Sequence, residues 1–220
     1  MAVGLLATSA CDGGRDDDLQ LAVLSRDSAF QGAAMQAGGE VAANLGTDHV
    51  LGRWLGDDNV LALMGLFNAR QIAAADAELR LWDSDLVRAL AEQMARDHAA
   101  MQHSADSLAG RMHVTAVPPA LGQQIDSTLR EQLDELTDKR GRALDRSYVG
   151  EQVATHRMMI NYFQKFGAVA ERRELVTLLD SQTVRLNTHL ARARALQESF
   201  ARADSARSDS ASRRSRLPRQ

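Results

Sequence analysis

Three histidines stand at buried-face positions of predicted helices, and imidazole is the commonest metal ligand in proteins. His98 lies in a stretch whose apolar residues recur at three-, four- and seven-residue spacings, the spacing of one helix face. Met94 precedes it by one helical turn, and a thioether sulfur or an imidazole nitrogen offers a lone pair to a soft or borderline ion. His156 with Met159, and also His189, occupy comparable positions further along the chain. These five residues are the predicted metal ligands, and thioether together with imidazole favours copper over iron.

The same side chains are also consistent with a structural polar network. Buried imidazoles must hydrogen-bond or cost on the order of 1 to 3 kcal/mol each, and methionines readily fill gaps in a core. Helical rise predicts that His98 and His156 lie at one height, each about 14 residues, or roughly 21 Å, along parallel helices. By the same count His189 is expected roughly two turns away, close to Tyr148 and Asp145. A facing pair of histidines follows from these heights, whereas a cluster of all three does not.

Amphipathic segments predict an all-α chain. Aromatic residues make up 4% of the sequence and prolines number three, so the residues typical of sheets are scarce. Helices are expected over residues 57–82, 83–112, 120–139, 142–166 and 171–202, with Gly167 marking the end of the fourth. The third is weaker in its pattern and, at about 30 Å, long enough to return along the bundle. Together the segments predict a ferritin-like four-helix bundle over 57–203, with a helical crossover between its second and third helices.

The two ends of the chain carry no sustained helical pattern. Residues 1–11 end in Thr8-Ser9-Ala10-Cys11 after a short apolar run, which is similar to the end of a bacterial lipoprotein signal peptide. Cys11 is the sole cysteine and the predicted lipidation site, so we expect an exported protein, either periplasmic or anchored to a membrane by an N-terminal lipid. Residues 12–56 are predicted to form a flexible tether, and residues 204–220 a disordered tail rich in Arg and Ser.

Charge and motifs exclude several classes of function. A net charge of −3 and a pI near 6.1 provide no general basic field, so nucleic acid is not an expected partner. Di-iron ferritin-like sites require two Glu-x-x-His motifs, and the sequence contains none, which disfavours ferroxidase chemistry. No serine or cysteine stands in a nucleophile motif. The chain is therefore not expected to be an enzyme.

Several short pieces, taken in their order and spacing, resemble one exported bacterial family. They are Met94-Ala95-Arg96-Asp97-His98, Val117-Pro118, Leu144-Asp145-Arg146-Ser147-Tyr148, His156 and His189. Over about residues 60–199 the chain is similar to the domain of unknown function 4142 family, whose members are often labelled outer membrane or ferritin-like proteins. The resemblance implies a ferritin-like fold and an envelope location, and it implies no reaction. Leu144, Gln102 and Gln71 stand where that family usually has Phe, Asn and an acidic residue.

Two functions of different class remain open. In the first, the chain is a helical bundle in the cell envelope that acts as a structural or interaction module, with core polar residues satisfied by one another. In the second, it binds a copper-like ion outside the cytoplasm through core histidine and methionine residues. Elemental analysis of the purified bundle separates the two.

Overall fold

The computed structural model describes residues 55–215, and the side chains of residues 55–210. Within this range the chain is all-α, as predicted, and contains no strand. Five helices follow one another: α4 (Asp57–Leu81), α5 (Asp85–Met112), α6 (Ala120–Thr137), α7 (Gly141–Val169) and α8 (Arg173–Ser215). The signal-like segment 1–11 with Cys11, and the predicted tether up to residue 54, lie outside the described residues.

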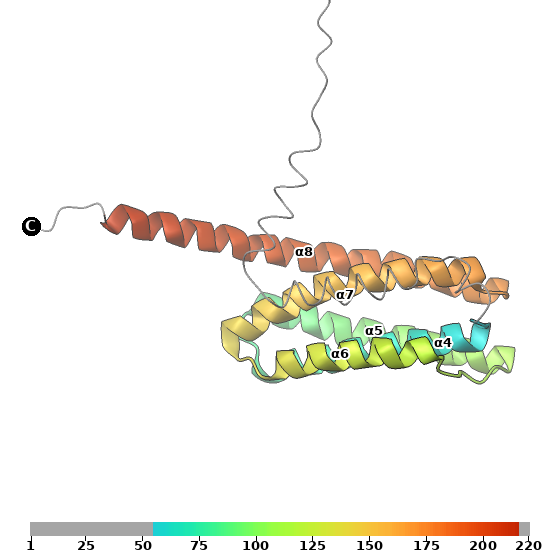
Figure 1. Cartoon of the computed structure of the whole chain (residues 1–220). Helices are drawn as coiled ribbons and strands as arrows, with labels where there is room; N and C mark the ends of the chain where they lie inside the picture. Colours follow the sequence, from blue (N-terminus) through green and yellow to red (C-terminus); the bar gives the residue numbers. More distant parts are fainter. Residues whose placement is uncertain (1–54, 216–220) are drawn as a thin grey trace, which may run out of the picture.

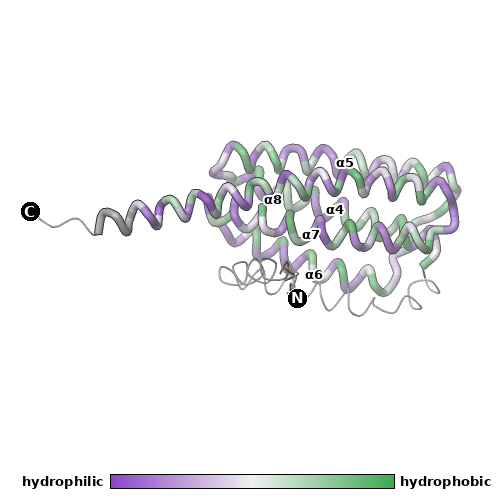
Figure 2. Tube along the Cα trace, turned by 90° about the horizontal axis from the view of Figure 1, so that it is seen from above, coloured by the Kyte–Doolittle hydropathy of each residue, from purple (hydrophilic) through white to green (hydrophobic). Residues whose placement is uncertain are grey.

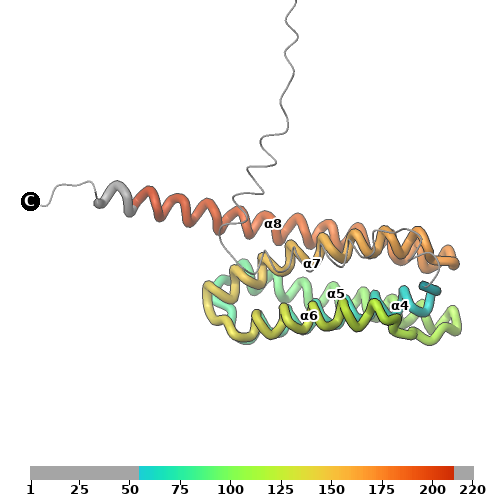
Figure 3. The backbone as a smooth tube through the Cα atoms, viewed as in Figure 1, coloured from blue at the N-terminus to red at the C-terminus, as the bar shows by residue number. Residues whose placement is uncertain are grey.

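Two antiparallel helix pairs, α4 with α5 and α7 with α8, are joined through α6 (Figure 1, Figure 3). From the end of α5, α6 runs back along α4, so α7 starts at the same end of the molecule as α5 and runs in the same direction. The sequence predicts this parallel relation from the length of the crossover segment. Residues at equal distances from the starts of α5 and α7 therefore lie at similar heights.

Two buried carboxylates join the helix pairs at opposite ends. Asp145, near the start of α7, accepts hydrogen bonds from the backbone N–H groups of Asp83 (3.0 Å) and Ser84 (2.8 Å), just before α5. At the other end Asp57, the first residue of α4, accepts the N–H of Glu171 at 2.9 Å. Each bond satisfies a backbone amide in a turn that has no helical partner. With a bond at each end, the axial position of α4 and α5 relative to α7 and α8 is fixed.

The predicted helix end at Gly167 is wrong. α7 continues through this glycine to Val169, where the N–H of Ala170 donates to the carbonyl of Phe166 at 2.8 Å. A glycine inside a helix costs about 1 kcal/mol relative to alanine. Burial of a phenylalanine side chain contributes roughly 1.5 to 3 kcal/mol, and Phe166 is fully buried on the last turn. Packing of the last turn thus outweighs the local signal for a helix end.

α8 is longer than its sequence pattern predicts. The predicted end is Arg202, with a disordered tail from residue 204, whereas α8 continues to Ser215. No glycine or proline interrupts residues 173–215, and alanine and arginine favour helix. Arg146 on α7 donates to Asp204 Oδ1 at 2.7 Å, which joins the start of the extension to the bundle. Beyond that contact α8 projects past the other helices and is largely hydrophilic (Figure 2).

The interior consists of two apolar clusters with a polar layer between them. Each long helix contributes to both clusters: Phe67 and Ala74 from α4, Met101 and Met94 from α5, Met159 and Val153 from α7, and Leu186 and Leu190 from α8. Between these positions each helix places a fully buried polar side chain, with Gln71 on α4 and Thr155 on α7 in addition. We call four of these side chains the histidine layer: Asn68, His98, His156 and His189. In the described part of the chain, no helix has a stretch long and apolar enough to cross a bilayer.

Candidate metal centre

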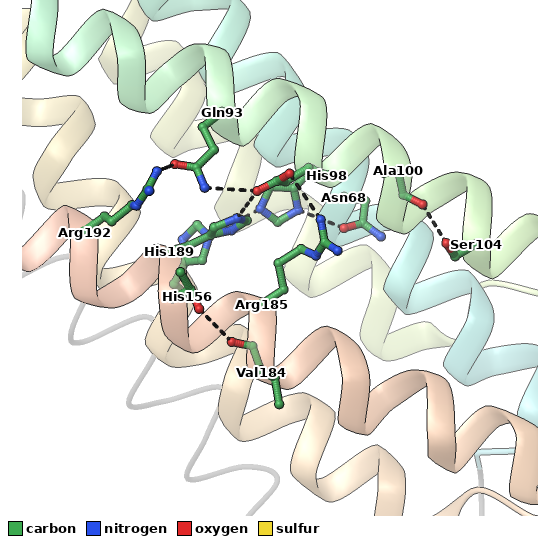
Figure 4. Close-up of polar contacts among 12 residues, drawn as sticks. Asn68, Gln93, His98, Ala100, Ser104, His156, Val184, Arg185, His189 and Arg192 are labelled. Atoms are coloured by element: carbon green, nitrogen blue, oxygen red, sulfur yellow. Dashed lines mark hydrogen bonds and ion pairs between the residues drawn. The ribbon is translucent and has the colours of Figure 1, made fainter.

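The three rings of the histidine layer face one another inside the bundle (Figure 4). His98 comes from α5, His156 from α7 and His189 from α8. Their ring centroids are 5.2 to 5.4 Å apart, so the rings form a nearly equilateral triangle. His98 Nε2 lies 3.3 Å from His156 Nε2, which in turn lies 3.2 Å from His189 Nδ1. One nitrogen of each ring is thus within 4.8 Å of one nitrogen of the other two, a grouping able to hold a metal ion.

The other nitrogen of each ring has a hydrogen-bond acceptor outside the triangle. His156 Nδ1 donates to the backbone carbonyl of Gln152 at 2.8 Å. His189 Nε2 donates to the carboxylate oxygen Oδ2 of Asp97, also at 2.8 Å. A backbone carbonyl and a carboxylate can only accept, so these two bonds determine which nitrogen of each neutral ring carries the hydrogen. The inner nitrogens of His156 and His189 are left as lone pairs.

The amide of Asn68 on α4 completes the arrangement. Its oxygen lies 2.9 Å from His98 Nδ1 and accepts the hydrogen of that nitrogen, so His98 Nε2 is also a lone pair. Three acceptors therefore face one another, with no hydrogen between His156 Nε2 and His189 Nδ1 at 3.2 Å. Facing acceptors make no hydrogen bond, and burying them without a partner is costly.

Two of the three distances between the inner nitrogens match the dimensions of a metal centre. Zinc–nitrogen bonds to histidine are about 2.0 to 2.1 Å long, and at tetrahedral angles they place two nitrogens about 3.3 Å apart. The two inner distances, from His156 to His98 and to His189, are 3.3 and 3.2 Å. A tetrahedral ion held by three imidazoles keeps a fourth position for another ligand.

Burial keeps all three imidazoles neutral. It lowers the pKa of His156 to about 3, and the neighbouring His189 adds to this effect. Burial likewise lowers the pKa of His98 well below its ordinary value, with smaller contributions from the other two rings. For His189 burial lowers the pKa even though the hydrogen bond to Asp97 acts in the opposite direction. Neutral imidazole is the form that binds metal, so the centre is in its binding form at neutral pH.

Asp97 connects the buried centre to the surface between α5 and α8. Its side chain is 24% exposed, and its Oδ1 accepts a hydrogen bond from Arg185 at 3.2 Å. Gln93 donates to Oδ2 at 3.2 Å, and Arg192 donates to Gln93 (Figure 4). Partial burial raises the pKa of Asp97, but hydrogen bonds from His189 and Gln93 bring it below the ordinary value. Asp97 is therefore a carboxylate that orients the His189 ring, as outer-shell partners of metal-binding histidines do.

The structure brings together three of the five predicted ligands. The predicted facing of His98 and His156 is confirmed. The predicted height of His189 is wrong, because the helix ends around it differ from those expected. His156 lies 13 residues before the end of α7 at Val169, and His189 lies 16 residues after the start of α8 at Arg173. That difference corresponds to about 4.5 Å, less than one turn, where the predicted ends implied roughly two turns.

Met94 and Met159 are fully buried but lie in different apolar clusters. Met159 packs in the cluster that includes Met101, and Met94 packs in the other, on the opposite side of the histidine layer. Among the described residues, the group with closely spaced ligand atoms contains neither a carboxylate nor a cysteine. The centre is therefore built from imidazole, with the thioethers in the apolar walls.

Sequence periodicity missed several polar side chains of the interior, among them Asp97, Glu78 and Glu151. Asp97 is adjacent to His98 in sequence and off the apolar face, and its partner His189 is 92 positions away, so no local pattern marks it. Glu78 is fully buried and Glu151 is 3% exposed. A signal for Glu78 exists, because it stands seven residues after the buried Gln71 and hence on the same helix face.

Comparison with known proteins gives one result. A protein-family model described as a domain of unknown function, DUF4142, matches residues 54–196. That range is more than half of the chain and contains the whole histidine layer together with Asp97. Neither the search of curated proteins nor the search of solved structures gave a match. The chain therefore belongs to the DUF4142 family, to which no function is assigned.

Proposed function

We propose that this protein binds one transition-metal ion at the histidine layer. The observation that carries the proposal is the pair of inner nitrogens of His156 and His189, which lie 3.2 Å apart as lone pairs. A core network built only for stability would place a donor against an acceptor at that distance. The outer hydrogen bonds to Gln152 and Asp97 instead hold both donors on the far sides of the rings. An ion bound by these lone pairs turns their repulsion into attraction.

Copper is the first candidate ion and zinc the second. Magnesium, calcium and manganese prefer oxygen ligands, which a set of three imidazoles does not supply. At a given nitrogen site, divalent copper binds more tightly than zinc or ferrous iron. Met94 and Met159 stand one turn from His98 and His156 on the same helices, and their polarisable sulfurs suit a soft ion.

The fold supports holding an ion rather than oxidising one. We propose a ferritin-like arrangement, because two helix pairs are joined by the α6 crossover and supply side chains to a shared core. The carboxylate-rich ligands of a di-iron centre are missing from the sequence, which has no Glu-x-x-His motif. All three rings are fully buried, so a bound ion is enclosed by protein.

We also propose that the protein works in the cell envelope. The support is the Thr8-Ser9-Ala10-Cys11 sequence after an apolar run, which resembles the end of a lipoprotein signal peptide. Expression of the full chain in a bacterial host, followed by detergent phase separation, tests this location. We expect the native chain in the detergent phase and Cys11→Ser in the aqueous phase. Equal partitioning of the two chains would contradict the lipid anchor.

The metal-binding proposal is tested by elemental analysis of the purified full chain after dialysis against copper or zinc. We expect close to one ion per chain, with copper displacing zinc. His156→Ala should reduce the bound metal to background, because it removes the ring whose Nε2 lies 3.3 Å from His98 Nε2 and 3.2 Å from His189 Nδ1. His103→Ala is the matched control, since His103 is exposed on the same helix as His98.

Two results would overturn the proposal. One is a native chain that retains no more metal than His156→Ala. The other is metal that remains bound after His156→Ala but is lost with surface histidines such as His103. In the first case the histidine layer is a structural network, and the role of a structural or interaction module takes its place.

A further inference from the structure

Besides Asp57 and Asp145, two more carboxyl groups are buried in the bundle outside the histidine layer. Glu78 on α4 is fully buried, and Glu151 on α7 is 3% exposed. As carboxylates, both oxygens of Glu78 and Oε2 of Glu151 receive no hydrogen bond from any described residue. A buried carboxylate without a donor is strongly disfavoured, so each group is more stable as a neutral acid. Burial is the largest of the causes that raise the pKa of each group to about 8.

In its acid form Glu78 is a donor, and Asp145 is its partner. Asp145 already accepts two backbone amides at the turn between α4 and α5, so both of its oxygens act as acceptors. Burial raises the pKa of Tyr148, and Glu151 and Glu78 add to the increase. The hydroxyl of Tyr148 therefore lies in the electrostatic field of both acids.

A stripe of buried polar side chains on α7 lies between Asp145, beside Glu78, and the metal centre. Asp145, Tyr148, Gln152 and His156 recur at three- and four-residue spacings, and all are buried. The backbone carbonyl of Gln152 accepts the Nδ1 hydrogen of His156, while its side-chain amide has no hydrogen-bond partner among the described residues. The stripe spans about 17 Å by helical rise. Charges separated by such distances interact more strongly in a protein interior than in water.

The other titratable groups that act on these two acids come from α7 and the turn before it. Asp145 and Tyr148 lie with Glu78, and a negative Asp145 disfavours ionisation of Glu78. Lys139, between α6 and α7, favours ionisation of Glu151, but burial outweighs it. The histidines that α5 and α8 contribute to the interior are neutral. The acids are thus protonated in a core that has no ion, and a nearby positive charge favours their ionisation.

We propose that binding of a divalent ion at the histidine layer is coupled to the release of protons from Glu78 and Glu151. The coupling rests on the proposed function, since it requires an ion at the three imidazoles. Neutral imidazoles lose no proton on binding, so the ion adds two positive charges to the interior. Each carboxylic acid whose O–H bond breaks sends its proton to solvent and keeps the electron pair as a carboxylate. Two such losses cancel the added charge, and no electron is transferred.

Titration calorimetry of the full chain with zinc ion at pH 6.5 measures the released protons. Zinc is used because it undergoes no redox reaction. Repeating the titration in buffers of different ionisation enthalpy gives the proton number from the slope of the observed enthalpy. We expect close to two protons per zinc ion. Because each released proton contributes a tenfold change per pH unit, affinity should rise about 100-fold from pH 6 to pH 7.

Neutral variants identify the source of the protons. Glu78→Gln and Glu151→Gln should each release about one proton fewer, and the double variant should release none and bind zinc with a nearly pH-independent affinity. Glu198→Gln is the matched control, because Glu198 is 70% exposed on α8. That variant should release as many protons as the native chain.

The failures of the two proposals are distinguishable. Zinc that binds stoichiometrically without proton release would overturn the coupling and leave the metal site intact. Undiminished release in the double variant would also overturn it, because the protons would then come from zinc-bound water or another group. No binding in the native chain would overturn the metal site itself, and the coupling with it.

Discussion

The histidine layer and the buried glutamates Glu78 and Glu151 are enclosed by the same helices, yet burial moves their pKa values in opposite directions. It lowers the pKa of His156 to about 3 and raises the pKa of each glutamate to about 8. A base and an acid respond oppositely because burial penalises whichever form is charged. Both regions are therefore neutral at pH 7.

The two regions differ in how their polar atoms are paired. Each histidine has one nitrogen bonded to an outer acceptor and the other within 4.8 Å of the inner nitrogens of the other two rings. Both oxygens of Glu78, by contrast, lack a donor unless the group is itself protonated. In the proposed function, the histidines are therefore preorganised to receive a positive ion, whereas the glutamates are groups able to supply the compensating negative charge.

The largest expected effect separates the two regions by the pH dependence of stability. Burial raises the pKa of each glutamate in the folded protein. Its contribution to the free energy of unfolding is therefore complete below pH 4.5 and is lost as pH rises toward about 8. We expect the metal-free native chain to lose on the order of 3 kcal/mol of unfolding free energy per glutamate across that interval. Glu78→Gln/Glu151→Gln should remove this loss. Urea unfolding at pH 5, 7 and 9 measures it.

At acidic pH, the unfolding free energy should depend on the histidines instead. Burial lowers the pKa of His156 in the folded protein. Its contribution to the free energy of unfolding is therefore present above pH 6.5 and is lost as pH falls toward about 3. The glutamate double variant should retain this acid loss unchanged. If its profile were flat on both sides, the two regions would not titrate independently, and the comparison would fail.

The second prediction tests whether the histidine layer serves metal binding or the stability of the fold. Replacement of His156 by Leu keeps the volume of the core and removes one facing lone pair, so we expect the metal-free chain to change by less than about 1 kcal/mol. Copper at about 1,000 times its Kd should stabilise the native chain by about 4 kcal/mol and His156→Leu not at all. Thermal unfolding with and without copper measures both quantities. A metal-free loss of several kcal/mol would show that the ring is needed for structure.

A smaller effect tests the orientation of His189 by Asp97. Asp97→Asn replaces a carboxylate acceptor by an amide that can also donate, and so loosens control of which ring nitrogen is the lone pair. We expect zinc or copper affinity to fall roughly 10- to 100-fold, as is usual for outer-shell partners. Competition with a chelator of known affinity measures the change. Unaltered affinity would mean that burial alone orients His189.

The smallest expected effect concerns Arg185, which binds Asp97 at the protein surface. Arg185 is 49% exposed where it pairs with Asp97. Exposed ion pairs contribute about 0 to 1 kcal/mol, so Arg185→Gln should alter metal affinity by less than about fivefold and stability by less than about 1 kcal/mol. A larger loss of affinity in the same chelator competition would make Arg185 part of the centre rather than of its solvent-exposed rim.

Much of the architecture could be predicted because helical periodicity is local. The spacing around His98 and His156 places both residues on inner faces, and the length of the 120–139 segment predicts the parallel direction of their helices. The ends of the helices were harder to predict from the sequence. Gly167 is a strong local signal, but packing of Phe166 extends α7 beyond it. An error of a few residues at each end displaced the predicted height of His189 by more than one turn.

The helical class of the chain, the histidines on its inner faces and the lack of a Glu-x-x-His motif are readable from the sequence, because these properties depend on residue type and on spacing within one helix. Tertiary structure alone decided that three rings from three helices converge, and that Asp97 and the carbonyl of Gln152 hold their hydrogens on the outside. It also decided that both oxygens of Glu78 and Oε2 of Glu151 are buried without a hydrogen-bond donor. These features could not be predicted because metal binding and pKa depend on distances of about 3 Å between side chains far apart in sequence, and helical periodicity does not encode such distances.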